Sequence, residues 1–403
     1  MPFRDAWLLV GGALVLVGFA ASQPIISAIG FVVILIGGIG RLWHARLFDR
    51  TTLTATLTEH RAFIDEPIAL EVELENRKLL PLPWYEWRMA LSDNLQVEGE
   101  ALASAVVPGL SWVYRKGSMG WYERRKWQFT LKANHRGFFQ IGPASLKSSD
   151  LFGLFPGEQP FERMERLTIY PRVFPLDDLG LPADRPFGER KGGTPVFEDP
   201  LRIAGLREYR PGDPLRRIDW KATARSGDLM SRVYEPSATR QLYICLNIDT
   251  LEKSWEGYLA EELEKMVSTA ASVAVWAAGA KYAVGLLANG SFPEADRPIR
   301  LPPGRARDQL ARILEALAVI QPLTMGDLAG TMFRELHRLP AGSTIIVVAS
   351  LIPEPLAGVI MRFHDQGHRV YVLATSERAV GVLPDAIPVK PIGQSLERWS
   401  ATG

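Results

Sequence analysis

The residues best equipped for chemistry gather between Arg202 and Arg232. This stretch contains eight Lys or Arg and four Asp or Glu residues. Guanidinium and carboxylate groups form charge-assisted hydrogen bonds, so the stretch suits an intramolecular clamp or a docking face. Because the acids are interleaved with the bases, a partner or interdomain surface is favoured over a nucleic-acid patch. No His or Ser stands in a triad relation to these groups, so a catalytic site here is the weaker alternative.

A short capped helix is expected to position these side chains. Pro211-Gly212 is typical of a turn. Asp213 followed by Pro214 is a common helix start, because Asp satisfies a free backbone N–H and Pro presets φ. The helix should run to about Arg225, with Gly227 as its stop. The candidate interaction residues of this signature segment are Arg207, Tyr209, Gly212, Asp213, Arg216, Asp219, Trp220, Lys221 and Arg225.

From about residue 240 the chain reads as strands alternating with helices. Apolar strands are expected at 241–249, 282–288, 344–350 and 369–374, and helices at 259–280, 306–320, 328–339 and 355–365. Near-continuously apolar strands separated by helices predict a mostly parallel sheet that is covered on both faces. Ligands of such folds bind at the carboxyl ends of the strands, where Asp249 stands. Asp249 is therefore the best-placed acid of this region.

Residues from about 51 to 170 carry the alternation of half-buried strands. In 68–75, for example, Ile, Leu and Val alternate with Ala and Glu. No amphipathic helix is evident, so a small β-sandwich is expected. A set of tryptophans could form a platform for stacking sugars or bases, but core and edge packing is favoured. These tryptophans are Trp84, Trp87, Trp112, Trp121 and Trp127.

The N-terminus is expected to be a membrane anchor. No charged residue occurs from Ala6 to Gly40, and one helix of that length would measure roughly 50 Å, well beyond a hydrocarbon layer of ~30 Å. Ser22-Gln23-Pro24 divides the stretch, which predicts a transmembrane hairpin with spans at about 6–21 and 24–42. A cleaved signal peptide is the alternative, opposed by the second apolar run. Arginines at both outer ends predict a cytoplasmic soluble part.

Composition limits the remaining possibilities. The net formal charge is +1, so no global attraction to nucleic acid is expected. Cys245, the single cysteine, suits a buried apolar position. His364 and His368 are four residues apart, but Gly367 between them is a helix stop, so they need not share a face. Neither a metal nor a cofactor is expected.

Two motifs resemble those of the bacterial domain-of-unknown-function family 58. The first is Arg207-Glu208-Tyr209-x-Pro211-Gly212-Asp213-x-x-Arg216-x-Ile218-Asp219-Trp220-Lys221-Ala222-x-Ala224-Arg225. The second is Arg136-Gly137-Phe138-Phe139-Gln140-Ile141-Gly142-Pro143, followed by Ser149-Asp150-Leu151-Phe152-Gly153-Leu154-Phe155. The second motif adds Arg136, Gly137, Asp150 and Gly153 to the candidate residues. The resemblance covers essentially the whole chain.

The resemblance implies an architecture and a kind of partner, but no settled activity. The C-terminal region would be an α/β domain like von Willebrand factor type A. Members of the family are commonly encoded beside MoxR-type AAA+ ATPases and transglutaminase-like membrane proteins. A role in a chaperone-like or maturation system is therefore implied, with these two kinds of protein as partners.

The chain departs from a metal-binding von Willebrand A domain at one loop. Such domains hold Mg²⁺ through Asp-x-Ser-x-Ser after the first strand, plus a distant Thr and Asp. Here Asp249 is followed by Leu251 and Lys253 at the serine positions, and neither side chain supplies the oxygen ligand that Mg²⁺ requires. A metal at Asp249 is not expected, although Glu252 and Ser254 leave a non-standard site open.

The sequence thus predicts a multi-domain, two-pass protein of the inner membrane. A hairpin (1–50), a β-sandwich (51–175), a linker with the signature segment (176–240) and a von Willebrand A-like domain (241–403) are expected in that order. The expected function is a non-enzymatic scaffold that docks a MoxR-type ATPase. The alternative is a hydrolase or transferase with a site near Arg207–Arg225 or Asp249. A third, weaker reading is contact with nucleic acid or anionic lipid.

Overall fold

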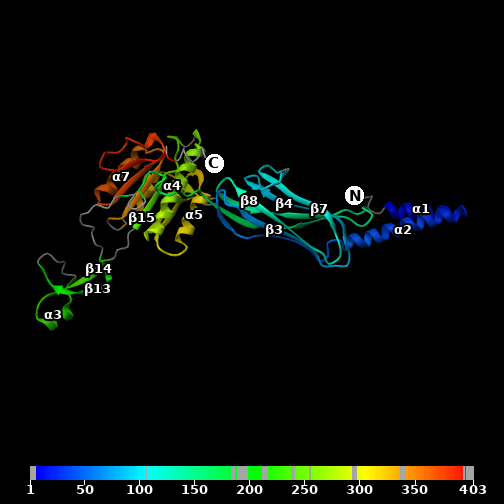
Figure 1. Cartoon of the computed structure of the whole chain (residues 1–403), viewed down its shortest axis with the longest axis horizontal. Helices are drawn as coiled ribbons and strands as arrows, with labels where there is room; N and C mark the ends of the chain where they lie inside the picture. Colours follow the sequence, from blue (N-terminus) through cyan, green and yellow to red (C-terminus); the bar gives the residue numbers. More distant parts are fainter. Residues whose placement is uncertain are drawn as a thin grey trace. The chain divides into compact units, whose positions relative to one another are not determined.

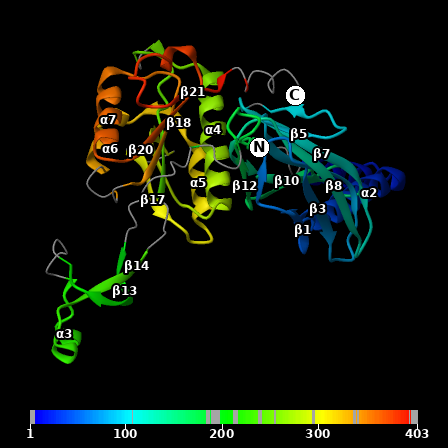
Figure 2. The ribbon, with the colours of Figure 1, turned by 60° about the vertical axis from the view of Figure 1, so that its left-hand side comes forward.

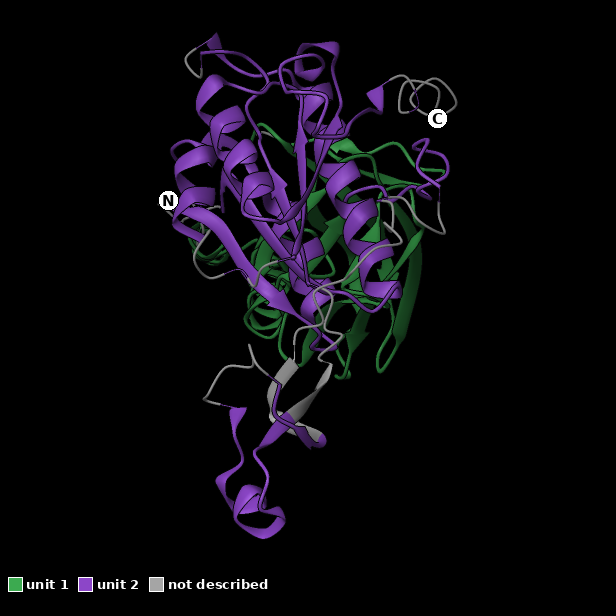
Figure 3. Cartoon of the chain, turned by 90° about the vertical axis from the view of Figure 1, so that its left-hand side faces the viewer, with its two compact units in different colours: residues 1–170 green, residues 171–403 purple. Residues whose placement is uncertain are grey.

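The computed structural model describes residues 6–105, 107–182, 187, 198–210, 217–236, 241–253, 256–292, 297–335, 339, 342–393 and 395. The chain divides into two compact units, Met1–Tyr170 and Pro171–Gly403 (Figure 3). The first unit holds two apolar helices and a set of mostly antiparallel sheets, and the second holds an α/β sheet. The protein is therefore multi-domain, as the sequence predicts.

Two apolar helices open the first unit (Figure 1). Helix α1 is Ala6–Ala20, and helix α2 is Pro24–Ala45 with Pro24 in its first turn. Glycines let the two backbones approach closely: a Cβ at Gly11 would lie 2.6 Å from Ile34, and one at Gly18 would clash with the Ser27 nitrogen. These contacts run in antiparallel order. By length and composition, α2 is long and apolar enough to cross a membrane, whereas α1 is shorter than a standard span.

The described part of the first unit continues with strands β1 to β12. They are β1 (Thr51–Leu57), β2 (Arg61–Phe63), β3 (Ile68–Asn76), β4 (Leu82–Ser92), β5 (Leu95–Val97), β6 (Ala103–Ser104), β7 (Leu110–Met119), β8 (Arg124–Ala133), β9 (Gly137–Ile141), β10 (Ala144–Ser148), β11 (Gly157–Phe161) and β12 (Glu165–Tyr170). Their sheets have the orders β1-β3-β8-β5, β11-β10-β4-β7-β6 and β2-β12-β9. The alternation read from 68–75 is confirmed, because β3 buries Ile68, Leu70, Val72 and Leu74.

Both larger sheets contribute to one apolar core. Trp87 of β4 is fully buried and lies against Trp127 of β8, with ring centroids 5.3 Å apart. Trp87 also meets Phe129 edge-on at 6.1 Å. Core packing is therefore confirmed for Trp87 and Trp127, whereas Trp84 and Trp121 are exposed. Large aromatic side chains fill the space between the sheets with few residues.

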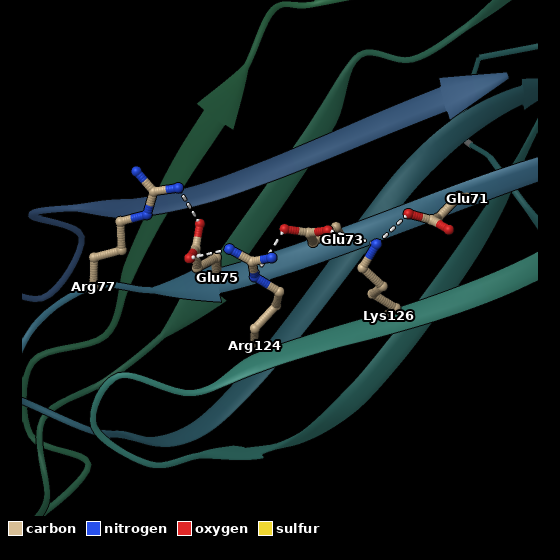
Figure 4. A network of polar contacts seen from close by, with 6 residues as sticks. All are labelled: Glu71, Glu73, Glu75, Arg77, Arg124 and Lys126. Atoms are coloured by element: carbon tan, nitrogen blue, oxygen red, sulfur yellow. Dashed lines mark hydrogen bonds and ion pairs between the residues drawn. The ribbon is translucent and has the colours of Figure 1, made fainter.

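The outer face of β3 and β8 carries a ladder of alternating charges (Figure 4). Antiparallel pairing sets Glu75 opposite Arg124 and Glu73 opposite Lys126. Arg124 bridges Glu73 and Glu75 at 3.2 and 2.8 Å, and Lys126 bridges Glu71 and Glu73 at 2.7 and 3.1 Å. Arg77 completes the ladder at 2.7 Å from Glu75. Opposite charges facing each other across strands reinforce this register.

The second unit contains a seven-stranded, mostly parallel sheet, with the order β17-β16-β15-β19-β20-β21 and β18 beside β16. The strands are β15 (Gln241–Leu246), β16 (Ala283–Ser291), β17 (Pro298–Gly304), β18 (Gln321–Thr324), β19 (Thr344–Ala349), β20 (Arg369–Ala374) and β21 (Val389–Pro391). The four apolar strands expected from the sequence are confirmed as the parallel set β15, β16, β19 and β20. The antiparallel edge strands β17 and β18 were not predicted.

Helices cover both faces of this sheet (Figure 2). They are α4 (Ala260–Gly279), α5 (Gln309–Val319), α6 (Leu328–Glu335) and α7 (Glu354–Asp365), followed by the short 3-10 helix η4 (Glu377–Ala379). Helices α6 and α7 pack on the face that carries Tyr243 and Cys245, and α4 and α5 lie on the other face. All four predicted helices are confirmed within a few residues of their expected bounds.

Candidate functional site

The signature segment forms a small module of two strands and one helix. Strands β13 (Glu198–Glu208) and β14 (Met230–Pro236) pair antiparallel, and helix α3 (Trp220–Ser226) lies between them in the chain. The Tyr209 nitrogen donates to the Leu229 carbonyl at 2.8 Å, which extends the ladder beyond β13. Within the described residues, β13 and β14 pair with no other named strand.

The expected start of the helix was wrong. Asp219 caps α3, because its Oδ1 accepts from the backbone nitrogens of Lys221 and Ala222, each at 3.0 Å. Ile218 pairs with Ser231 as an isolated bridge, so residues 218 and 219 are extended and the helix begins only at Trp220. The predicted stop is confirmed, since Gly227 ends the helix at φ 83°. Gly212, Asp213 and Arg216 lie outside the described residues.

Asp219 also joins the helix to β14. Its Oδ2 accepts from the Arg232 Nε at 2.9 Å, and its own backbone nitrogen donates to the Met230 carbonyl at 2.9 Å. The backbone N–H of Ala222, and then Arg232, hold the pKa of Asp219 below its ordinary value. Asp219 is therefore an ionised structural carboxylate with both oxygens engaged, which makes it a poor general base.

The outer surface of α3 is open. None of the residues of α3 is buried. Trp220, its first residue, is 68% exposed, and Lys221 and Arg225 are exposed on the same helix. Arg207 lies on β13 and donates to the Glu208 carbonyl at 3.1 Å. The structure thus gathers Asp219 with Arg232, whereas it leaves Trp220, Lys221 and Arg225 exposed.

The second motif organises a different place, in the first unit. Arg136 and Gly137 lead into β9, where Gly137 has φ 149°. Asp150 is buried at the centre of the loop between β10 and β11. Its carboxylate accepts from the backbone nitrogens of Phe152 at 2.9 Å and Phe155 at 2.6 Å, which folds the loop around it. Gly153 adopts φ 72°, a backbone conformation that favours glycine.

The loop around Asp150 is also joined to the helices. His44 Nδ1 lies 2.9 Å from the Phe155 carbonyl oxygen, and the Phe155 ring meets Trp7 edge-on at 6.4 Å. A Cβ at Gly40 would lie 3.1 Å from an Asp150 oxygen and 3.0 Å from the Phe155 ring. Asp150 therefore shapes a joint between α2 and the β-domain, which is the part of the first unit that contains strands β1 to β12 (Thr51–Tyr170).

Asp249 lies at the carboxyl edge of the parallel sheet, as expected for the residues that follow β15. Thr324 Oγ1 donates to its Oδ1 at 2.8 Å, and Asn289 Nδ2 donates to its Oδ2 at 2.9 Å. Ser350 Oγ donates to its carbonyl at 3.2 Å. Burial raises the pKa of Asp249, opposed by the bonds from Thr324 and Asn289. This cluster draws on four separate segments of the domain.

The residues around Asp249 do not fit Mg²⁺. Both carboxylate oxygens face N–H or O–H donors, and Asn289 presents its NH₂ group where a hard cation would require an oxygen. Asn289 is held in this orientation, because its Oδ1 accepts from the Ile248 nitrogen at 2.8 Å. Among the described residues, no group of three or more His, Cys, Asp or Glu side chains could hold a metal.

Sequence reasoning missed the partners of Asp249. Asn289 ends the apolar run of β16, and Asn247 ends that of β15, where it accepts from Asn289 at 3.0 Å. A polar residue at the carboxyl end of each neighbouring parallel strand was the available signal. Thr324 carries no such signal, because it belongs to the edge strand β18. Cys245, by contrast, is buried as expected, and burial raises the pKa of its thiol.

Comparison with known proteins gives two sequence matches. Residues 205–390 match the model of a family described as protein of unknown function DUF58. The uncharacterised protein YeaD of Bacillus subtilis is 24% identical over 212 residues, which are 51% of this chain and 48% of YeaD. The matched region thus spans about half the length of this relative.

Solved structures resemble about a third of the chain. The CARDB domain of a Pyrococcus furiosus protein covers 30% of this chain and 96% of its own length, at 12% identity and a TM-score of 0.20. A cohesin module of a Clostridium perfringens glycoside hydrolase covers 30% of this chain and 97% of its own length, at 11% identity and a TM-score of 0.21. Likeness at these TM-scores supports no inference about this chain.

Proposed function

Residues 205–390 of this chain belong to DUF58, a family of proteins of unknown function, and from this premise we propose that the protein is a membrane-anchored adaptor, not an enzyme. Its α/β domain, like von Willebrand factor type A, docks a MoxR-type AAA+ ATPase, and a transglutaminase-like membrane protein belongs to the same system. The resemblance in the two motifs implies these partners. The adaptor acts in a chaperone-like or maturation process.

The anchor is a two-pass hairpin of the inner membrane in this proposal. Helix α2 has the length and composition of a span. Helix α1 packs against it through glycines at Gly11, Gly18, Gly30 and Gly37, and small residues favour close packing of helices in lipid. Exposed Arg41 lies near the C-terminal end of α2, and exposed Arg46 and Arg50 follow the helix, so the soluble part lies in the cytoplasm by the positive-inside rule.

In this proposal the signature module, which precedes the α/β domain in the chain, takes part in docking, and one observation supports its part: Trp220 opens α3 with 68% of its surface exposed. Trp and Arg are the residues that most often dominate binding energy at protein interfaces. Here Trp220 shares a helix with Lys221 and Arg225, and Asp219 fixes the start of that helix. A basic surface around an exposed indole fits a partner surface that offers an apolar pocket beside acidic groups.

A hydrolase or transferase centred on Asp219 or Asp249 is the competing proposal. It would require one of these carboxylates to be directed at a substrate. Each oxygen of Asp219 already accepts from the helix cap or from Arg232, and each oxygen of Asp249 accepts from Thr324 or Asn289. Mutually satisfied groups of this kind support a structural role for the two acids.

Reconstitution tests the docking function. The full-length protein in nanodiscs is mixed with a purified MoxR-type ATPase, with and without nucleotide, and binding is measured by pull-down. We expect binding to the wild type, and a loss of about tenfold or more for Trp220→Ala, because hot-spot truncations cost about 2 kcal/mol or more. Tyr114→Ala is the matched control, since it removes an exposed aromatic of β7. Absence of binding in every nucleotide state would refute the proposal that a MoxR-type ATPase is the partner.

A further inference from the structure

Exposed apolar side chains gather at one end of the β-domain. They lie in three loops, 77–81, 120–123 and 149–156, and their exposed fractions run from 45% to 71%. Monomeric soluble proteins rarely leave a large apolar patch uncovered, so such a patch marks a binding surface. The six residues, called here the collar, are Leu79, Trp121, Tyr122, Leu151, Phe152 and Leu154.

Hydrogen bonds place the first two loops next to Arg50 and Thr51, where the segment after α2 enters β1. The Arg77 nitrogen donates to the Arg50 carbonyl at 3.0 Å, and Lys78 Nζ donates to Thr51 Oγ1 at 2.5 Å. The loop 120–123 is joined to the same place, because the Tyr122 nitrogen donates to the Lys78 carbonyl at 3.2 Å. Both loops therefore surround the residues that directly follow the anchor.

The third loop contacts α2 itself. Phe155 lies against Gly40, and its carbonyl oxygen is bonded to His44. Between these two contacts on the helix stands Leu42, which is 68% exposed. Pro24 to Leu42 would measure about 28 Å at about 1.5 Å per residue, which is close to the hydrocarbon thickness. The loop thus meets α2 at the level where the hydrocarbon layer would end.

The loop therefore lies at the same depth along α2 as Leu42, although it contacts another side of the helix. Asp150 holds the loop rigidly from inside, through the nitrogens of Phe152 and Phe155, so Leu151, Phe152 and Leu154 stay outside. Trp and Tyr prefer the boundary between headgroups and acyl chains, which suits Trp121 and Tyr122. Exposed Arg46 and Arg50, in the segment that joins α2 to β1, can meet anionic headgroups.

We infer that the collar is a third membrane contact, in which the β-domain rests on the bilayer with these loops in the headgroup region. This inference rests on the proposed crossing of the membrane by α2. It assigns a role to the second motif: Asp150 presents apolar side chains to lipid. The collar thereby fixes the β-domain against the membrane surface, which a flexible tether alone would not do.

Depth-dependent quenching tests the collar. Leu151→Cys and Phe152→Cys variants of the full-length protein are labelled with an environment-sensitive dye and placed one copy per nanodisc. The buried thiol of Cys245, whose pKa is raised, does not compete for the label. Val107→Cys is the control in water, since Val107 is exposed beside β7 at the opposite end of β4. Val32→Cys on α2 is the control in the hydrocarbon.

The inference predicts that lipids spin-labelled near the headgroup quench the probes at 151 and 152 severalfold more than the probe at 107. The inference is overturned if iodide in water quenches the probes at 151 and 152 as fully as the probe at 107. If the probe at 32 is still quenched by spin-labelled lipid in that case, the proposed crossing by α2 stands. Shielding of 151 and 152 from both quenchers overturns it too, because another part of the chain then covers them. If lipid does not quench the probe at 32, the proposed crossing itself fails.

Discussion

Arg232 and Asp219 form an ion pair that closes the signature module, with the Arg232 Nε 2.9 Å from the Asp219 Oδ2. The other oxygen of the same carboxylate caps α3. One side chain therefore determines both where the helix begins and how it is held to β14. The exposed face of α3 depends on this double role.

Replacing Asp219 should loosen α3 without unfolding either unit. Asp219→Ala leaves the Lys221 and Ala222 nitrogens without their acceptor, and we expect exchange of these amides to accelerate about fivefold, the usual effect of a lost cap. Amide hydrogen exchange read by mass spectrometry measures this. Asp228→Ala, at an exposed position of the same module, is the control. Equal exchange in both variants would contradict the role of the cap.

The pH dependence of this cap follows from the lowered pKa of Asp219. Because the folded pKa lies below the unfolded value of about 3.9, the stabilisation is present above that value and is lost as pH falls through the folded pKa. Near neutral pH the cap should therefore stay formed and should keep protecting the α3 amides from exchange. Loss of the cap should accelerate their exchange only at acid pH, where Asp219 becomes protonated.

The contribution of Asp249 to folding stability should depend on pH in the opposite direction. Burial raises its folded pKa, so its contribution to stability is complete below about pH 3.9 and declines as pH rises through the folded pKa. Asp249→Asn removes this titration, and we expect the pH profile of thermal unfolding of the α/β domain to become flatter above pH 4. Thr375→Val, another buried polar position, controls for general destabilisation. A profile unchanged by Asp249→Asn would contradict the assignment.

Magnesium provides a separate check on the Asp249 cluster. Since the oxygens of Asp249 are engaged by Thr324 and Asn289, millimolar Mg²⁺ should not raise the unfolding temperature of the α/β domain. A ligand that binds the folded state alone at 100 times its Kd would stabilise by about 2.7 kcal/mol, which calorimetry detects easily. Such a shift, abolished by Asp249→Asn, would show that the cluster rearranges into a metal site.

Trp87 tests the core of the β-domain. It is fully buried against Trp127 and Phe129, so Trp87→Ala should cost about 3–5 kcal/mol of unfolding free energy. Its indole N–H has no acceptor among the described residues, so Trp87→Phe loses no hydrogen bond and should cost only about 1 kcal/mol. Chemical denaturation of the full-length protein in detergent measures both. Similar losses for the two variants would contradict the packing described.

Glu75 reports on the charge ladder. Hydrogen bonds from Arg77 and then Arg124 lower its pKa to about 2. Its stabilising effect should be present above the unfolded value of about 4.3 and be lost as pH falls toward 2. Glu75→Gln should flatten acid unfolding of the β-domain in this window, and NMR titration measures the pKa directly. Glu59→Gln, outside the ladder, is the control. A normal pKa for Glu75 would contradict the geometry of the ladder.

The sequence was sufficient for elements whose pattern is local. The strict alternation in Ile68–Leu74 and the long apolar runs at 344–349 and 369–374 predicted β3, β19 and β20. A strand buried on one face has alternating apolar residues, and a strand buried on both faces has a continuous apolar run. The start of α3 could not be found this way. Asp213 and Asp219 are both good caps, and the pairing of Ile218 with Ser231, a long-range contact, selects the second.

The candidate site was predictable to the same degree. Asp249 followed from its place after an apolar strand, but Thr324 joins it from 75 residues further along the chain, and no local pattern marks such a pair. The apolar character of Leu151, Phe152 and Leu154 is evident from the sequence. Their exposure is not, because it depends on the burial of Asp150 at the centre of the loop. Burial of a carboxylate is decided by the fold.

Affinity purification of the full-length protein from native membranes tests the central claim most directly. The wild type, Trp220→Ala and Tyr114→Ala are each purified, and the proteins that accompany them are identified by mass spectrometry. The proposed adaptor function predicts that a MoxR-type AAA+ ATPase accompanies the wild type and Tyr114→Ala, and is depleted about tenfold or more with Trp220→Ala. Purification of all three without any AAA+ ATPase would contradict it.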